Sequence, residues 1–125
     1  MNIAPLEAGE LHAAVTRADN VVTVTFKGTA DSRVDSELES YLGRIHAALL
    51  KEPAAQVDVD IRGLEFMNSS CFKGFITWIV QVRRMDPSNR YRIRFLSTPK
   101  HPWQKRSLHA ISYFGGDLIM IVVDD

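Results

Sequence analysis

Cysteine is almost absent from this sequence, and so is any excess of charge. Cys71 is the one cysteine in 125 residues, so no internal disulfide can form. Fifteen lysines and arginines balance fifteen aspartates and glutamates, whereas nucleic-acid-binding proteins usually carry a basic excess. We therefore expect no nucleic-acid partner, and the lone cysteine agrees with a reducing, cytoplasmic setting.

Long apolar runs are missing as well. The two longest, residues 75–80 and 118–123, are far shorter than the roughly 20 residues that cross a bilayer. The first ten residues contain no basic segment followed by an apolar core, so we predict no signal peptide. With 46% hydrophobic and 24% charged residues, the composition predicts one globular domain, residues 1–125, that does not insert into a membrane.

Motifs for catalysis and metal binding are missing too. The sequence has no P-loop, no dinucleotide glycine fingerprint, no nucleophile elbow and no zinc-protease helix. None of the four histidines stands at metal-ligand spacing from another histidine or from Cys71. Asp58 and Asp60 supply too few ligands for a cation by themselves. We therefore predict a protein that is not an enzyme and has no metal and no cofactor.

Five segments predict β-strands, because β-branched and aromatic residues alternate with polar ones or form short apolar runs. They are residues 11–16, 21–27, 57–61, 91–96 and 118–123. Turn-forming residues at 18–20 separate the first two strands, which predicts a hairpin. Residues 118–123 are apolar throughout, so we expect this strand to pair inside the sheet and to be covered on both faces.

Three further segments have apolar residues at helical spacing and predict α-helices. After a loop at 28–34, the first begins at Ser36, with a glutamate three residues later in capping-box spacing, and ends before Pro53. The second follows residue 68, and the third begins near Pro102 and ends at the glycines 115–116. The expected buried positions are Leu38, Tyr41, Leu42, Ile45 and Leu49, then Phe72, Phe75, Ile76, Ile79 and Val82, then Trp103, Leu108, Ile111 and Phe114.

This order of elements predicts the α/β class, with a mixed, mostly parallel sheet of about five strands and three main helices. Acidic residues alternate on one predicted strand, as Asp58 and Asp60, and basic residues alternate on another, as Arg92 and Arg94. If these strands are neighbours, the opposite charges face each other across the sheet. That arrangement would explain, without a ligand, the one local cluster of basic residues, which is Arg83, Arg84, Arg90, Arg92 and Arg94.

The junction Asn68-Ser69-Ser70 lies between a predicted strand and a predicted helix. Asn68 or Ser69 can cap the helix, because its side-chain oxygen can accept an unpaired backbone N–H. A hydroxyl at this place is also accessible, and a phosphate on it would meet the positive end of the helix dipole. Phosphorylation would add about −1.5 to −2 charges to one patch and repel a partner fitted to the neutral surface. A helix cap and a phosphorylation switch are both open interpretations.

Residues 57–71 resemble the signature of STAS domains in anti-sigma-factor antagonists, which is an apolar strand, a short link and Asp-Ser-Ser/Thr-Gly opening a helix. Residues 22–31 resemble the second strand of that family, because they contain Lys27 and Gly28 and end at Asp31. The resemblance covers most of the chain. It implies a single STAS-type α/β domain that works as a non-enzymatic, partner-switching regulator.

The resemblance also implies residue roles and partners. By position, Ser69 is the implied phosphoacceptor and Ser70 the alternate. The implied partner-binding residues are Asn68, Ser69, Ser70, Cys71, Lys73, Gly74 and Asp31. The implied protein partners are a histidine-kinase-like ATPase that doubles as an anti-sigma factor, a PP2C-type phosphatase, or, in a related branch, a diguanylate cyclase. The sequence departs from the family at Asn68, where the family has Asp, and at Cys71, where it has Gly.

Two other functions stay open. A STAS-type module could bind its partner constitutively, with Ser69 and Ser70 serving only the helix end. A small-molecule sensor would instead need a large apolar pocket, near Trp78 or Trp103, where strand ends meet helix starts. Cys71 at a helix start could be a reactive thiol, but we expect a small buried side chain.

Overall fold

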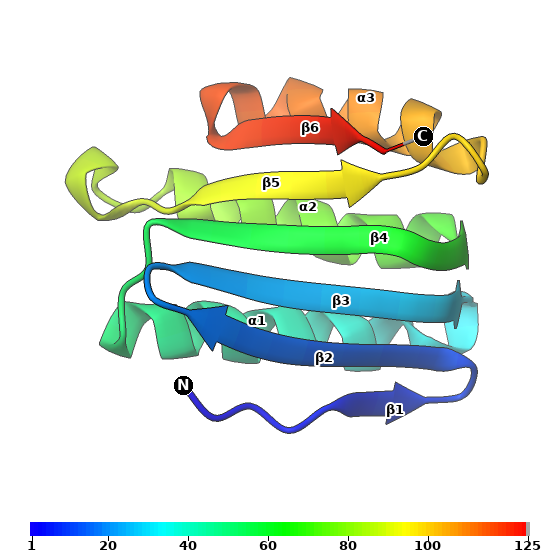
Figure 1. The fold of residues 1–125 in the computed structure, drawn as a ribbon, viewed down its shortest axis with the longest axis horizontal. Helices are drawn as coiled ribbons and strands as arrows, with labels where there is room; N and C mark the ends of the chain where they lie inside the picture. The colour runs from blue at the N-terminus through cyan, green and yellow to red at the C-terminus, as the bar shows by residue number, and fades with distance from the viewer. Residues whose placement is uncertain (125) are drawn as a thin grey trace.

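One six-stranded sheet with three α-helices against a single face makes up the computed structural model, which describes residues 1–124 (Figure 1). The strands are β1 (Leu6–Ala8), β2 (Leu11–Ala18), β3 (Val21–Ala30), β4 (Gln56–Met67), β5 (Arg92–Ser97) and β6 (Ile119–Val123). They lie in the sheet in chain order. β1 to β3 are antiparallel neighbours, and β3 to β6 are parallel. The predicted α/β class and mixed sheet are confirmed, with β1 as an extra strand.

The helices are α1 (Asp35–Lys51), α2 (Ser69–Arg83) and α3 (Trp103–Gly115). Each crossover between parallel strands moves one strand further in the same direction. Because such crossovers are right-handed, all three helices lie on the same face of the sheet. The other face carries the polar members of the alternating strands, such as Thr23, Thr25 and Asp58. The carboxyl ends of β3, β4 and β5 therefore meet at one edge, beside the starts of the helices that follow β4 and β5.

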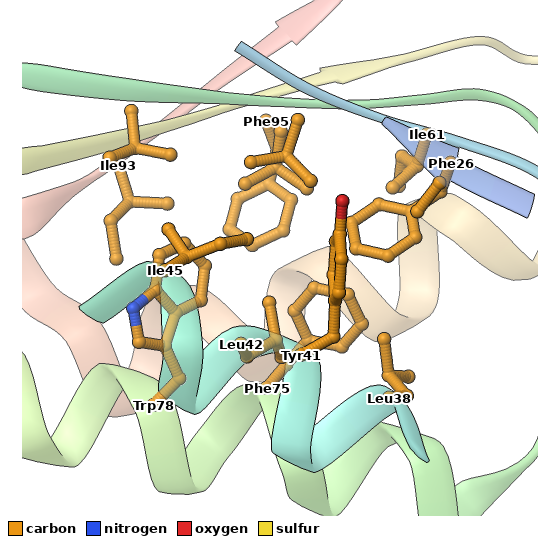
Figure 2. Close-up of a cluster of buried hydrophobic side chains, with 14 of the residues drawn as sticks. Phe26, Leu38, Tyr41, Leu42, Ile45, Ile61, Phe75, Trp78, Ile93 and Phe95 are labelled. Atoms are coloured by element: carbon orange, nitrogen blue, oxygen red, sulfur yellow. The ribbon is translucent and has the colours of Figure 1, made fainter. Parts of the chain in front are cut away.

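The hydrophobic core lies between the helical face of the sheet and the helices (Figure 2). All five predicted positions of α1 are buried, as the helical spacing required. In α2 the prediction was wrong in part, because Trp78 is 1% exposed and central to the core, whereas Phe72 and Ile76 are only partly buried. Phe75 packs edge-on against Phe26, with ring centroids 5.6 Å apart. Burying an aromatic side chain of this kind contributes about 3 kcal/mol to folding.

A hydrogen-bonded chain of three side chains crosses the core from α2 to α1. The Trp78 Nε1–H donates to the Tyr91 hydroxyl oxygen at 2.8 Å, and this hydroxyl lies 2.7 Å from His46 Nδ1. With its oxygen accepting from Trp78, the Tyr91 hydroxyl can donate its own proton to His46 Nδ1 in the tautomer that leaves this nitrogen unprotonated. Burial lowers the pKa of His46 below its ordinary value of 6.5.

This chain of hydrogen bonds predicts that the protein loses stability as the pH falls below 6.5. In that range the unfolded state binds a proton at His46 and the folded state resists it, so acid favours unfolding until the folded-state pKa is passed. Thermal melts between pH 5 and 8 measure the effect. His46→Gln is the control, because glutamine can accept the Tyr91 proton without titrating; its melting temperature should fall less with acid. If the melting temperatures of wild type and His46→Gln fell equally with pH, His46 would not be the group responsible.

The segment before α1 differs from the predicted loop and capping box. β3 continues through Gly28 to Ala30, and Asp31 then caps a short 3₁₀ helix (Ser32–Val34) by accepting from the Arg33 backbone N–H at 2.9 Å. The chain is therefore already helical when it reaches Ser36, which is the second residue of α1. The capping box was wrong for this reason.

The predicted pairing of charges between two strands is confirmed for one pair. Asp58 of β4 stands opposite Arg94 of β5, and the guanidinium group donates to both carboxylate oxygens, at 3.0 and 2.7 Å. Asp60 instead binds Arg62 on its own strand, at 2.9 Å. Arg92 is exposed. The prediction was wrong for these two because the register of β4 and β5 sets Arg92 opposite Gln56 and Asp60 opposite Leu96.

The last helix and strand are more exposed than predicted. β6 is an edge strand, and Met120, Ile121 and Val123 are 45%, 37% and 61% exposed. The apolar run predicts a strand that is paired inside the sheet and covered on both faces, but β5 is the one neighbour of β6 among the described strands. In α3, Leu108 and Ile111 are buried as predicted, but Trp103 is only partly buried and Phe114 is 46% exposed, and the polar Gln104 is fully buried.

Candidate functional site

Asn68 connects the end of β4 to the start of α2. Its backbone N–H donates to the Ala30 carbonyl oxygen at 2.8 Å, which holds the end of β4 beside the end of β3. Its side-chain Oδ1 accepts from the Ser70 backbone N–H at 2.9 Å, in the extended backbone conformation of a helix cap. Of the two candidate residues, Asn68 is therefore the helix cap and Ser69 is not.

The two serines of the junction have different surroundings. The Ser70 hydroxyl donates to Asn68 Oδ1 at 2.9 Å and is partly buried. Ser69 is the first residue of α2 and is exposed, and within residues 1–124 its hydroxyl makes no hydrogen bond. The Ser69 hydroxyl is thus open to a modifying enzyme, whereas that of Ser70 is occupied by the cap.

Asp31 lies beside this junction although it is far away in the sequence. Its carbonyl oxygen accepts from the Cys71 thiol, with 3.3 Å between sulfur and oxygen. Its carboxylate binds the Arg33 guanidinium at 2.7 Å, and this hydrogen bond is the main reason why the pKa of Asp31 is lowered. The site therefore carries a charged carboxylate next to the start of α2.

Cys71 and Gly74 point into the protein and Lys73 points out. Cys71 is buried, as we expected. Gly74 is buried where α2 meets α1, and a Cβ on it would lie 3.5 Å from the Cβ of Glu39. Lys73 is exposed, one helical turn after Ser69. Of the seven predicted partner-binding residues, these two buried ones shape the site by packing, and the other five reach its surface or border it.

The Cys71 thiol is expected to be unreactive in the folded protein. Burial, followed by the negative charges of Asp35 and Asp31, raises its pKa to about 11. Because the thiolate is the reactive form, alkylation by a maleimide at pH 7 should be about 100-fold slower, or more, than after unfolding in guanidinium chloride. Mass spectrometry of timed samples gives both rates. Equal rates would contradict the assignment and reopen the possibility of a redox site.

Two residues near the site were missed by the sequence analysis. Phe66 is 46% exposed at the end of β4 and adds an apolar surface beside the junction. Gln104 is buried in α3; its Nε2 donates to the carbonyl oxygens of Ile61 and Leu64 at 2.6 and 3.1 Å, and its Oε1 accepts from the Thr98 N–H at 2.9 Å. The signal for Gln104 was present, because it shares a helical stripe with Leu108.

The order of the six strands, the helices on one face and the serine junction at the start of α2 define a STAS-type fold, the fold of anti-sigma factor antagonists. One solved structure with a similar fold is that of an anti-sigma factor antagonist from Mycobacterium paratuberculosis. The TM-score is 0.63 at 16% sequence identity, over 92% of this chain and 90% of that one. A second is the anti-sigma factor antagonist SpoIIAA in its unphosphorylated form. Here the TM-score is 0.60 at 17% identity, over 88% of this chain and 87% of that one.

The resemblance to STAS domains seen in the sequence is thereby confirmed at the level of the fold. No protein-family profile matches the sequence. No curated protein matches it either. Within residues 1–124, no helix has both the length and the apolar character needed to cross a membrane.

Proposed function

We propose that this protein is a non-enzymatic, partner-switching regulator of the cytoplasm. The surface around Asn68, Ser69, Ser70, Lys73 and Asp31 binds a protein partner, and phosphorylation of Ser69 controls that binding. The observation that carries the proposal is the contrast between the two serines. The Ser69 hydroxyl is exposed without a hydrogen bond in the described chain, while Ser70 is held by the cap.

The electrostatics of the junction support a switch at Ser69. A phosphate there would lie at the amino end of the 15-residue helix α2, where backbone N–H groups and the helix dipole stabilise negative charge. The Asp31 carboxylate is paired with Arg33, and Lys73 is exposed one turn away, so the phosphate would change the sign of the charge at this patch. A partner fitted to the neutral serine would be repelled. The fold need not change, because the Ser69 side chain bonds to no other described residue.

The two departures from the STAS signature are compatible with this role. Asn68 keeps the capping hydrogen bond to the Ser70 N–H without adding a charge beside the hydroxyl. Cys71 replaces a glycine, but its side chain is buried against the Asp31 backbone and leaves the surface unobstructed. Both substitutions therefore leave Ser69 accessible.

The proposed partner is a protein of the kind that STAS regulators bind. It is a histidine-kinase-like ATPase acting as an anti-sigma factor, with a PP2C-type phosphatase that removes the phosphate, or a diguanylate cyclase. Both structural neighbours are described as anti-sigma factor antagonists, and one is specified as unphosphorylated. A sensor of small molecules is less well supported, since Trp78 is fully packed in the core and the partly buried Trp103 does not line the open groove beside α3.

The switch is tested by affinity capture from an extract of the native host, with wild type, Ser69→Ala and Ser69→Asp as baits. We expect wild type and Ser69→Ala to retain the same kinase-like or cyclase partner and Ser69→Asp to lose at least about 90% of it, because the aspartate introduces a charge at the contact. Mass spectrometry identifies and quantifies the captured proteins.

Thr77→Asp is the matched control for this experiment. It places the same charge on an exposed side chain of α2, about two helical turns after Ser69 and outside the proposed surface, and should retain the partner. Circular dichroism must show that all baits are folded. Equal recovery of the partner by all baits would contradict the switch and leave a constitutive binding module.

A further inference from the structure

The outer edge of β6 offers unpaired backbone groups. The Asp124 N–H donates to the Ser97 carbonyl oxygen at 2.9 Å, toward β5. Because peptide groups alternate in direction along a strand, those of Val122 and Met120 also point toward β5. Those of Ile121 and Val123 point outward, where no described strand pairs with them. β6 is the outermost strand in Figure 1, with α3 behind it.

An open groove of about 860 Å³ runs between this edge and α3. Leu108, Ile121 and Val123 line it with apolar surface, and Lys105, Arg106 and His109 line it with basic or imidazole groups. No aspartate or glutamate is among the described residues that line it. The groove therefore combines exposed strand edge, aliphatic surface and one sign of charge.

We propose that this groove binds an extended acidic segment of a partner protein, which adds to β6 as a seventh strand. The outward N–H and C=O groups of Ile121 and Val123 would supply the backbone hydrogen bonds. Side chains of an added strand alternate between the two faces of the sheet. Acidic residues on the helical face would meet Lys105 and His109, while β-branched residues on the other face would pack beside Met120 and Val122.

Charge decides between this partner and a second copy of the chain. An antiparallel pair of β6 strands would bring only the aliphatic side chains of residues 119–123 to the groove. It would also place the basic side chains of the two α3 helices on the same side of the joined sheet, where they repel. An acidic strand can bind the outward N–H and C=O groups of β6 and can also place opposite charges against the basic side chains of α3.

The test uses a fluorescent synthetic peptide of seven residues in which valine alternates with glutamate, titrated with the full chain by fluorescence anisotropy. The control peptide has lysine in place of each glutamate. We expect saturable binding of the acidic peptide and at least about tenfold weaker binding of the basic one, because like charges oppose docking. Reversing the charge of the groove with Lys105→Glu and Arg106→Glu should make the basic peptide bind more tightly than the acidic one.

Val123→Pro tests the strand addition itself. It removes an outward N–H, at an edge position where proline is tolerated, and should reduce acidic-peptide affinity about tenfold or more. Val123→Ala removes side-chain surface but keeps the N–H, and should bind at least three times better than Val123→Pro; melting curves verify that both are folded. Ser69→Asp should leave peptide affinity unchanged, which separates this surface from the proposed switch.

Three outcomes would overturn the proposal. The first is the same affinity for the acidic and basic peptides, and the second is binding that neither the charge reversal nor Val123→Pro weakens. The third is a dimer of the chain, seen by sedimentation, that Val123→Pro dissociates, because this would assign the edge of β6 to a second copy.

Discussion

Replacing Gly28 with alanine should destabilise the protein by about 3 kcal/mol or more, because two separate costs add. Gly28 lies inside β3 with a φ of +91°, a backbone conformation that side chains with a Cβ rarely adopt. A Cβ at this position would also lie 1.9 Å from the Glu10 carbonyl oxygen. That contact is with backbone, so no side-chain rotation relieves it.

The effect of Gly28→Ala should extend to the functional site. The Thr29 N–H donates to the same Glu10 oxygen at 3.1 Å, and Ala30 then holds Asn68 through its carbonyl oxygen. Moving the backbone at Gly28 therefore disturbs the end of β3 on which the Asn68 cap depends. Urea unfolding followed by circular dichroism measures the stability change.

Gly43→Ala is the matched control. Gly43 is exposed in α1, and a Cβ there would meet nothing within 4 Å. The same chemical change should therefore stabilise the protein by up to about 1 kcal/mol, because alanine is the better helix former. The unfolding free energy should therefore fall for Gly28→Ala and rise for Gly43→Ala. A neutral Gly28→Ala would show that the observed path of β3 is wrong.

Replacing Gln104 with methionine should cost about 3–5 kcal/mol although it changes the side-chain volume little. The amide of Gln104 makes three hydrogen bonds, to the oxygens of Ile61 and Leu64 and to the Thr98 N–H. Methionine would leave these buried backbone groups without partners, at about 1–3 kcal/mol for each. The same bonds tie the start of α3 to β4, the strand that leads into Asn68.

Gln81→Met is the control for Gln104→Met. Gln81 is exposed on α2, so the same substitution there should change the unfolding free energy by less than about 0.5 kcal/mol. Chemical denaturation of both variants measures the difference. Similar stabilities for both would mean that the buried amide of Gln104 contributes nothing to the fold.

Local patterns in the sequence were enough to predict most of the fold. The stripe of α1 from Leu38 to Leu49 and the hairpin of β2 and β3 follow from side-chain periodicity and turn residues alone, and both are present. The parallel arrangement of β3 to β6 follows from the alternation of strands and helices. These features depend on neighbours in the sequence, which is why they could be predicted.

Features that depend on distant neighbours could not be predicted. An apolar run such as Ile119–Val123 suits a buried strand and an unpaired edge equally, and the position of β6 in the sheet decides between them. Trp78 is not among the expected buried positions of α2, yet it is buried, and the hydroxyl of Tyr91 gives its indole N–H a partner. Gln104 shares a helical stripe with Leu108, but two of its hydrogen-bond partners are about 40 residues away, so nothing in the local sequence indicates partners for a buried amide.

The candidate site was predicted in outline and resolved in detail by the structure. The sequence placed a polar junction at the start of a helix, but its pattern allowed either Asn68 or Ser69 as the cap. The backbone conformation and the bond to the Ser70 N–H assign the cap to Asn68. Phosphorylation of Ser69 and the partner surface around it stay predictions.

Phosphate transfer to Ser69 is the most direct test of the proposed switch. Wild type, Ser69→Ala and Ser70→Ala would be incubated with native-host extract and ATP, and phosphopeptides located by mass spectrometry. We expect one phosphoryl group on wild type and on Ser70→Ala, located at Ser69, and none on Ser69→Ala. Phosphate that persists at this junction in Ser69→Ala, or a wild-type protein that stays unmodified, would contradict the proposed switch.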